Sequence, residues 1–162
     1  MTADLISVLV FLVGDKSFCL EIDVIDHVIS ACAISPVPDT KSDIEGIINI
    51  RGRIMPVVNM GSKCFSKPIP LALSDKFIII TIEKRYLALH VTDTLEILTL
   101  KKTAITEPDT ILPGLSVISG IIQYAQELSL LYNPRKFFRN EFMEASEEEP
   151  QETNHDTAPE IC

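Results

Sequence analysis

The chain of 162 residues carries a formal net charge of −9, and 46% of it is hydrophobic but only 6% aromatic. Residues 141–162 hold eight acidic and no basic residues, which leaves 15 acidic and 14 basic residues in 1–140. This nearly neutral body has no basic stripe for phosphates, so we expect no nucleic-acid partner. Its apolar residues are mostly Ile, Leu and Val, which favours strands in one domain or two small, closely packed ones.

The first third of the chain predicts a hairpin followed by a loop. In Leu5–Val13 the residues that point to either face of a strand are apolar, which indicates a strand buried on both faces. Phe18–Ile22 is expected to form the returning strand after a turn. Val24–Ile29 fits a strand or a helical turn. Residues 34–39 contain two prolines and predict an extended loop, and 39–45 a short helical turn.

The remainder predicts more hairpins and one late helix. We expect a proline-containing connector at Cys64–Leu73, and strands at Lys76–Ile82, Tyr86–Val91, Leu95–Leu100, Val117–Gln123 and Leu128–Tyr132. Asn133 is expected to cap a helix with Pro134 in its first position, extending from Arg135 to about Phe142. We therefore predict a folded domain over 1–143 and a disordered acidic tail over 144–162, because the tail has too little apolar surface to offset its ordering entropy.

The cysteines Cys19, Cys32, Cys64 and Cys162 form no Cys-x-x-Cys pair and have no histidine at a metal-ligand spacing. Free thiols in a reducing cytosol explain them better than a disulfide framework or zinc, and we expect no metal and no cofactor. The apolar run Leu5–Val13 is too short for a signal core or a spanning helix. We therefore expect a cytoplasmic protein without direct membrane insertion.

The most informative stretch is 45–60, EGIINIRGRIMPVVNM, which predicts two apolar strands meeting at Gly52. Gly52 suits a positive φ in a tight turn beside Arg51. Pro56 has no N–H to donate, so the return strand should be an edge strand or break there. Asn49 and Arg51 are two residues apart, so both side chains should emerge on one face beside the turn.

This stretch resembles the signature G-x-x-N-L-R-G-x-x-x-P-V-x-D-L-R of the CheW-like domain, the coupling module of bacterial chemotaxis arrays. The chain is similar to that family over about residues 5–140. The resemblance implies a mainly β fold of two SH3-like, five-stranded barrels around a shared hydrophobic core, with short helices. It further implies a non-enzymatic adaptor between the cytoplasmic tip of a chemoreceptor and the regulatory domain of a chemotaxis histidine kinase, close to membrane-bound receptor arrays.

The resemblance also implies the binding residues. Arg51 would contact the receptor tip; the alternative is an arginine satisfied within its own turn. His27 occupies a position where the family usually has a glutamate, so that contact would be altered, and Asn59 to Gly61 replace the family's Asp-Leu-Arg, which we interpret as a detail of the fold. The expected receptor-binding residues, lining a groove between the barrels, are Arg51, Asn49, His27, Val28, Ile48, Ile78 and Ala88, and the expected kinase-binding residue is Thr94.

Other functions remain open at this point. The sequence has no Gly-x-Ser-x-Gly, glycine-rich phosphate loop or paired catalytic carboxylates, which argues against an enzyme. His90 lies among strand residues and is expected to be a satisfied sheet residue. The alternatives are an adaptor of a pilus-motility or other non-flagellar chemosensory system, a small-molecule-binding β-barrel, or an enzyme on an unrecognised barrel.

Overall fold

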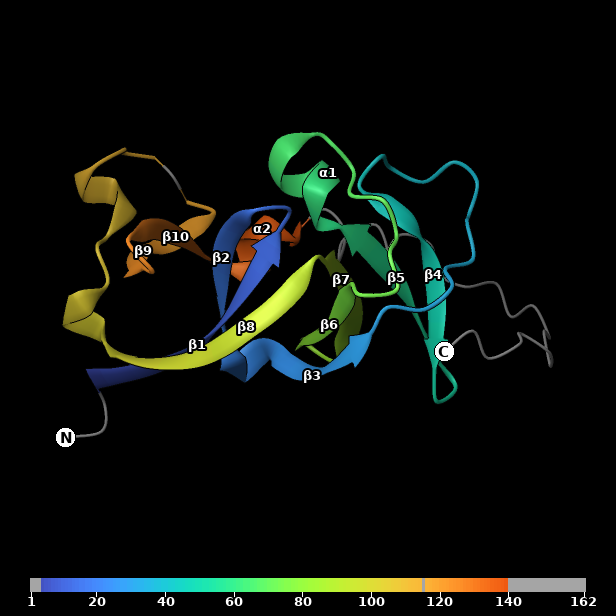
Figure 1. Cartoon of the computed structure of the whole chain (residues 1–162), viewed down its shortest axis with the longest axis horizontal. Coiled ribbons are helices and arrows are strands. Elements are labelled where there is room, and N and C mark those ends of the chain that lie inside the picture. Colours follow the sequence, from blue (N-terminus) through green and yellow to red (C-terminus); the bar gives the residue numbers. More distant parts are fainter. Residues whose placement is uncertain (1–3, 115, 140–162) are drawn as a thin grey trace.

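The computed structural model describes residues 4–114 and 116–139, and in this part of the chain ten strands form two five-stranded sheets. One sheet has the order β8-β1-β2-β10-β9 and is called the terminal sheet; the other has the order β3-β6-β7-β5-β4 and is called the middle sheet (Figure 1). The predicted mainly β fold of two five-stranded units with short helices is confirmed. The strands are β1 (Leu5–Val13), β2 (Lys16–Glu21), β3 (Ile25–Ser30), β4 (Ile44–Ile50), β5 (Arg53–Asn59), β6 (Lys76–Ile82), β7 (Arg85–Val91), β8 (Asp93–Lys101), β9 (Ile118–Tyr124) and β10 (Glu127–Tyr132), and the helices are α1 (Met60–Phe65) and α2 (Pro134–Phe137).

Strand β1 is buried on both faces, as its sequence predicts. Val8 and Val10 pack into a core enclosed by the terminal sheet, whereas Leu9, Phe11 and Val13 point to the opposite side. There they join a core shared by both sheets. Because side chains alternate along a strand, the continuous apolar run supplies both cores at once.

Strand β6 does the same for the middle sheet. Phe77 and Ile79 pack into the core enclosed by that sheet, and Ile78 and Ile80 pack into the shared core. The expected shared core between the two sheets is thus present, and it joins side chains from both ends and the middle of the chain.

The prediction that the return strand is an edge or breaks at Pro56 is wrong. Strand β5 is continuous and lies between β4 and β7. Its parallel pairing with β7 covers only Val57 to Asn59, so Pro56 stands just before that ladder. Pro56 pairs with Ile47 of β4 on the other side. An interior strand therefore tolerates the proline because one of its two ladders begins after it.

Two local predictions differ from the structure in the position or type of an element, and one open alternative is resolved. Helix α1 begins before Cys64 and occupies the first residues of the predicted connector. The helix starts there because the Asn59 side chain accepts a hydrogen bond from the Ser62 N–H. The helical turn predicted over 39–45 is absent, because Asp39 has a φ of 60° and β4 already begins at Ile44. For Val24–Ile29, where the sequence fits a strand or a helical turn, Val24 is the last residue of a 3-10 turn and the rest belongs to β3.

Two further expectations concern the chain end and the cysteines. Asn133 precedes α2, but its side chain makes no capping hydrogen bond. The predicted continuation to about Phe142 and the acidic tail lie outside the described residues. Cys19 and Cys64 have free thiols, whereas Cys32 is disulfide-bonded, so the expectation of four free thiols is wrong at Cys32.

Candidate interaction site

The turn between β4 and β5 consists of Arg51 and Gly52, both with positive φ, of 53° and 84°. Positive φ at both central residues defines a type I′ turn, which matches the twist of a two-residue hairpin. The Asn49 side chain stabilises the turn, because its Oδ1 accepts a hydrogen bond of 2.8 Å from the Gly52 N–H. Arg51 is exposed, whereas Asn49 is only 8% exposed.

The prediction that Asn49 and Arg51 emerge together from one strand face is therefore wrong. Strand β4 ends at Ile50, and the left-handed backbone of Arg51 interrupts the alternation of side chains. Asn49 has a turn-forming role, and Arg51 alone presents its side chain to the surface.

An open hollow of about 280 Å³ lies beside this turn. It brings together Arg51 and His27, which are 24 positions apart in the sequence and which the family resemblance implies for receptor binding. All of its lining residues belong to the middle sheet and its hairpin turn. They are Asp26, His27, Ile50, Arg51, Arg53, Met55, Ile79 and Tyr86.

The acidic side of the hollow is an Asp26–His27 pair that the sequence reasoning missed. The pairing of β3 with β6 shifts register between Ile25 and His27, so Asp26 is the extra residue of a β-bulge. A bulge re-aims side chains, and here neighbouring residues line the same hollow. His27 Nδ1 and Asp26 Oδ2 lie 2.5 Å apart, and both side chains are more than 40% exposed.

The opposite wall is fixed by Arg53 and Tyr86. The Arg53 guanidinium lies 3.7 Å from the centre of the Tyr86 ring, which is a close cation–π contact. Sequence reasoning missed both residues, because Arg53 on β5 and Tyr86 on β7 meet only when the two strands pair in the sheet. The hollow therefore has two arginines, one of them in contact with the face of an aromatic ring.

Three of the expected groove residues lie elsewhere. Ile48, Ile78 and Ala88 are 0% exposed. Ile48 and Ala88 belong to the core of the middle sheet and Ile78 to the shared core, so the prediction that they line an open groove is wrong. Strands β4, β6 and β7 are each buried on both faces, so these three side chains point into a core and not to the surface. Val28 of β3 is exposed.

The hollow is also not a groove between the barrels. Met55 and Ile79, at its base, belong to the core of the middle sheet. It therefore opens over the interior of that sheet alone, and the expected position between the two barrels is wrong.

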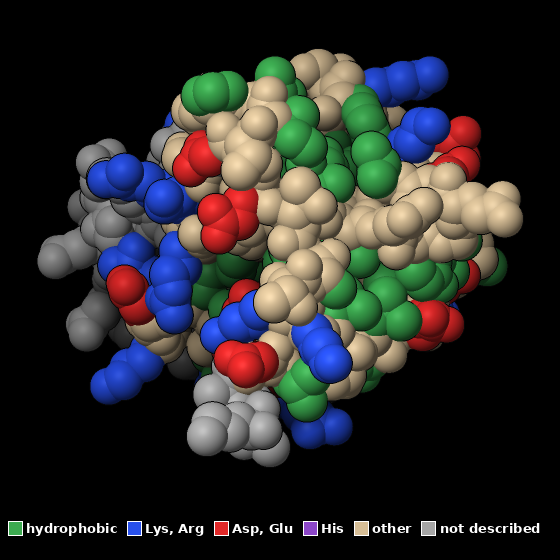
Figure 2. Space-filling view, turned by 90° about the vertical axis from the view of Figure 1, so that its left-hand side faces the viewer, with side chains coloured by type: hydrophobic (Ala, Val, Ile, Leu, Met, Phe, Trp, Pro, Cys, Tyr) green, Lys and Arg blue, Asp and Glu red, His purple; other side chains and the backbone are tan. Residues whose placement is uncertain are grey.

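Thr94 lies in a different region, on β8, and is partly buried. Strand β8 is an edge of the terminal sheet. Two apolar neighbours on the same strand, Leu95 and Ile97, are exposed, Ile97 by 62%. Figure 2 views the end of the molecule around the terminal sheet and shows apolar side chains gathered there, and exposed Leu5 and Leu128 belong to the same sheet.

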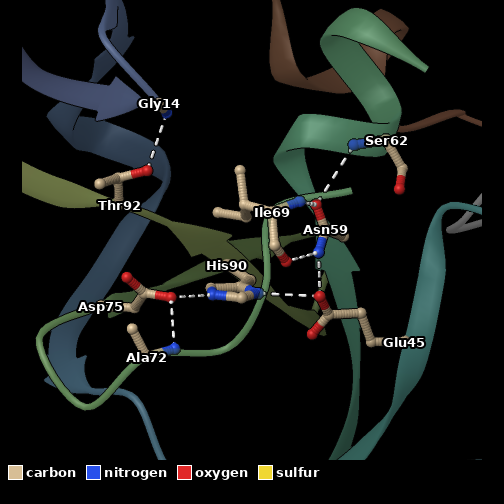
Figure 3. A network of polar contacts seen from close by, with 9 residues as sticks. All are labelled: Gly14, Glu45, Asn59, Ser62, Ile69, Ala72, Asp75, His90 and Thr92. Carbon is tan, nitrogen blue, oxygen red and sulfur yellow. Dashed lines mark hydrogen bonds and ion pairs between the residues drawn. The ribbon is translucent and has the colours of Figure 1, made fainter. Parts of the chain in front are cut away.

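A buried polar network lies within the middle sheet, around Asn59 and His90 (Figure 3). The Asn59 Nδ2 donates to Glu45 Oε1 and, at 2.8 Å, to the Ile69 carbonyl. Its Oδ1 accepts from the N–H groups of Ser62 at 3.2 Å and Ile69 at 3.0 Å. All four hydrogen-bonding positions of the amide are thus used, which supports the interpretation of Asn59 as a detail of the fold.

His90 lies at the centre of this network and is 0% exposed. Its Nδ1 lies 2.9 Å from Glu45 Oε1 and its Nε2 lies 2.6 Å from Asp75 Oδ2. Burial lowers the pKa of His90, but the hydrogen bonds and charges of Glu45 and Asp75 raise it, and the net direction is above its ordinary value. The expectation of a satisfied sheet histidine is confirmed.

The described residues, 4–114 and 116–139, contain no group of three or more His, Cys, Asp or Glu side chains arranged to hold a metal ion. In the same part of the chain, no helix has the length and apolar character needed to cross a membrane. The features that do stand out are an arginine turn above a shallow hollow and an apolar sheet edge, on two barrels with one shared core. An exposed arginine and an exposed apolar sheet edge are typical of surfaces that bind other proteins.

Comparison with known proteins identifies the family. The profile of the CheW-like domain matches residues 7–142, and the chain belongs to that family. It is 43% identical over 53 residues to the chemotaxis protein CheW of Thermotoga maritima, covering 33% of this chain and 35% of that protein. It is 19% identical over 134 residues to the chemotaxis protein CheW of Treponema pallidum, covering 79% of each. The fold is similar to the scaffolding protein TtCheW of Thermoanaerobacter tengcongensis, with a TM-score of 0.73 and 22% identity over 82% of this chain and 87% of that one.

Proposed function

We propose that this CheW-like scaffold couples the cytoplasmic tip of a chemoreceptor to the regulatory domain of a chemotaxis histidine kinase. The observation that carries the proposal is the exposed Arg51 at the rim of the hollow that His27 also lines. Two of the residues that the family resemblance assigns to receptor binding, Arg51 and His27, lie at one surface on separate elements, the β4–β5 turn and β3. The signal would then be transmitted by a difference in binding affinity between the states of the kinase, without a chemical reaction in the scaffold.

The hollow suits a helical partner such as the hairpin tip of a receptor. Arg51 has a planar fork of donors that binds a carboxylate or a helix-end carbonyl with defined geometry. The Arg53–Tyr86 contact provides a rigid wall against which a helix can pack. Asp26 and His27 supply the acidic side, so a partner helix with a basic residue opposite them would be favoured.

The kinase would bind at the terminal sheet. Strand β8 offers an edge with exposed Leu95 and Ile97 next to Thr94, which suits packing against the sheet edge of another barrel. Receptor and kinase would then occupy different sheets, and the shared core would join the two sites through packed side chains.

Arg51→Ala tests the receptor site, with Arg135→Ala as the matched control. Arg135 is also an exposed arginine, but it lies on α2, outside the hollow. We expect Arg51→Ala to weaken binding of a receptor-tip hairpin by roughly 1–3 kcal/mol, the contribution of a hydrogen bond to a charged group. Kinase binding and melting temperature should not change, and the control should bind both partners normally.

Opposite outcomes would reject the assignment. If Arg51→Ala binds the receptor tip normally while remaining folded, the hollow is not the receptor site. If it loses both partners and melts at a lower temperature, Arg51 is a structural turn residue. Thr94→Arg should show the reverse selectivity, losing the kinase domain but retaining the receptor tip.

A further inference from the structure

We propose that His90 is held as an imidazolium and forms a pH-sensitive latch, which fixes the connector between α1 and β6 to the middle sheet. The latch consists of His90 with Glu45 and Asp75, and the connector is residues 66–75.

The hydrogen bonds determine the charge of the ring. A carboxylate oxygen accepts hydrogen bonds, and each ring nitrogen of His90 has such an oxygen as its partner, at 2.9 Å and 2.6 Å. With both carboxyl groups ionised, both nitrogens carry a proton, which occurs only in the imidazolium. The ring has no exposed surface, so water cannot replace either partner.

The surroundings contain the charges needed to hold a buried cation. Glu45 reaches His90 from β4, and Asp75 from the end of the connector. The strands on either side of β7 present uncharged residues opposite His90, Asn59 from β5 and Phe77 from β6. Loss of the proton would leave two carboxylates with one N–H between them, which is costly in a buried site.

The latch holds the connector at two points. Asp75 Oδ2, besides contacting His90, accepts from the Ala72 N–H at 3.0 Å. Glu45 Oε1, the other partner of His90, also accepts from Asn59, which in turn binds both backbone groups of Ile69. Figure 3 shows these contacts as one continuous chain from Ala72 through Asp75, His90, Glu45 and Asn59 to Ile69.

The connector carries apolar side chains that the latch keeps in position at the surface. Leu71 is 48% exposed and lies between Ile69 and Ala72, and Leu73 is 97% exposed and lies between Ala72 and Asp75. Opening of the latch would therefore change an exposed apolar surface without unfolding the sheets.

The direction of the pH effect follows from the raised pKa of His90. A histidine whose pKa is higher in the folded state stabilises that state fully below its unfolded value of about 6.5. This stabilisation is lost as the pH rises through the folded pKa. The latch is therefore closed below the ordinary pKa of histidine and opens as the pH rises through the raised pKa of the folded state.

The first measurement uses the unmodified full-length chain. Nitrogen-detected imidazole spectra, recorded between about pH 5.5 and pH 9, should show His90 with two slowly exchanging ring N–H protons at neutral pH and a titration midpoint above its ordinary value. His27→Gln identifies the exposed ring, and His155→Gln the remaining one. A neutral His90 ring with a single N–H at neutral pH would overturn the proposal without any change to the network.

The second measurement tests the latch itself. After correction for intrinsic exchange, hydrogen-exchange protection at the Ala72 and Ile69 N–H groups should fall roughly tenfold or more as His90 loses its proton, while β1 stays protected. His27→Gln, which removes an exposed histidine, should retain this pH dependence, and His90→Gln should abolish it. Protection that is independent of pH in the unmodified chain, or that follows His27 instead, would refute the latch.

Discussion

The substitution Asn59→Asp tests whether the fold needs an amide at the centre of the buried network. The change preserves size and shape but replaces an amide by a carboxylate, which accepts hydrogen bonds and donates none. The two acceptor contacts, to the N–H groups of Ser62 and Ile69, can persist. The two donated bonds, to Glu45 and to the Ile69 carbonyl, are lost.

The expected cost follows from these two bonds and from charge. A hydrogen bond contributes roughly 0.5–1.5 kcal/mol, and a buried acceptor left without its donor costs about 1–3 kcal/mol. The new carboxylate would also face Glu45, which already has one buried oxygen without a hydrogen-bond partner. We therefore expect Asn59→Asp to lower the free energy of unfolding by about 2–4 kcal/mol at neutral pH.

Urea denaturation measures this loss, with Asn49→Asp as the matched control. Asn49 is also nearly buried, but its side-chain oxygen accepts a hydrogen bond from the Gly52 N–H, which a carboxylate can continue to do. The free energy of unfolding of the control should fall by less than about 1 kcal/mol. An Asn59→Asp protein as stable as the parent would refute the donor argument, and equal losses in both variants would attribute the effect to the added charge alone.

Three further predictions concern the body of the protein. Ile79→Asp places an unpaired charge in the core of the middle sheet and should cost several kcal/mol and yield insoluble protein, whereas Ile97→Asp, at an exposed site, should express and melt normally. Gly46→Ala should lower the melting temperature, because a Cβ there would lie 2.1 Å from the carbonyl oxygen of Ser35; an unchanged melting temperature would contradict this close approach. Truncation after residue 143 should leave the melting temperature nearly unchanged, and a loss of several degrees would show that the acidic segment packs on the body.

The sequence allowed most strands to be predicted, because the pattern of apolar residues is local. In β1, and in β6 after Lys76, every position carries an apolar or small side chain, and such runs indicate strands buried on both faces. The same runs could not indicate which core each residue joins. That assignment depends on which strands pair, and the decisive parallel pairings, β2 with β10 and β5 with β7, join distant segments.

The candidate site was predictable only in part, for a related reason. Arg51 stands next to a glycine in a recognisable turn, so its exposure follows from local chemistry. Asp26 and Glu45 each occupy a β-bulge, at the register shifts in β3 and β4, and nothing in their sequence context distinguishes a bulged residue from its neighbours. The network around His90 joins residues from four separate segments, and no spacing in the sequence indicates that contact.

The division of strands between the sheets also sets an order for assembly of the chain. The middle sheet takes all its strands from one continuous segment, residues 25–91, so its strand pairings span less of the chain and can close early. The terminal sheet needs β1 and β2 to meet β8, β9 and β10 across that whole segment. On a ribosome, the face of the first hairpin that packs inside the terminal sheet must therefore stay uncovered until the last hairpin has been made. The first strands synthesised are thus among the last to be buried, and the interval between the two events is the period in which the nascent chain is most exposed to aggregation.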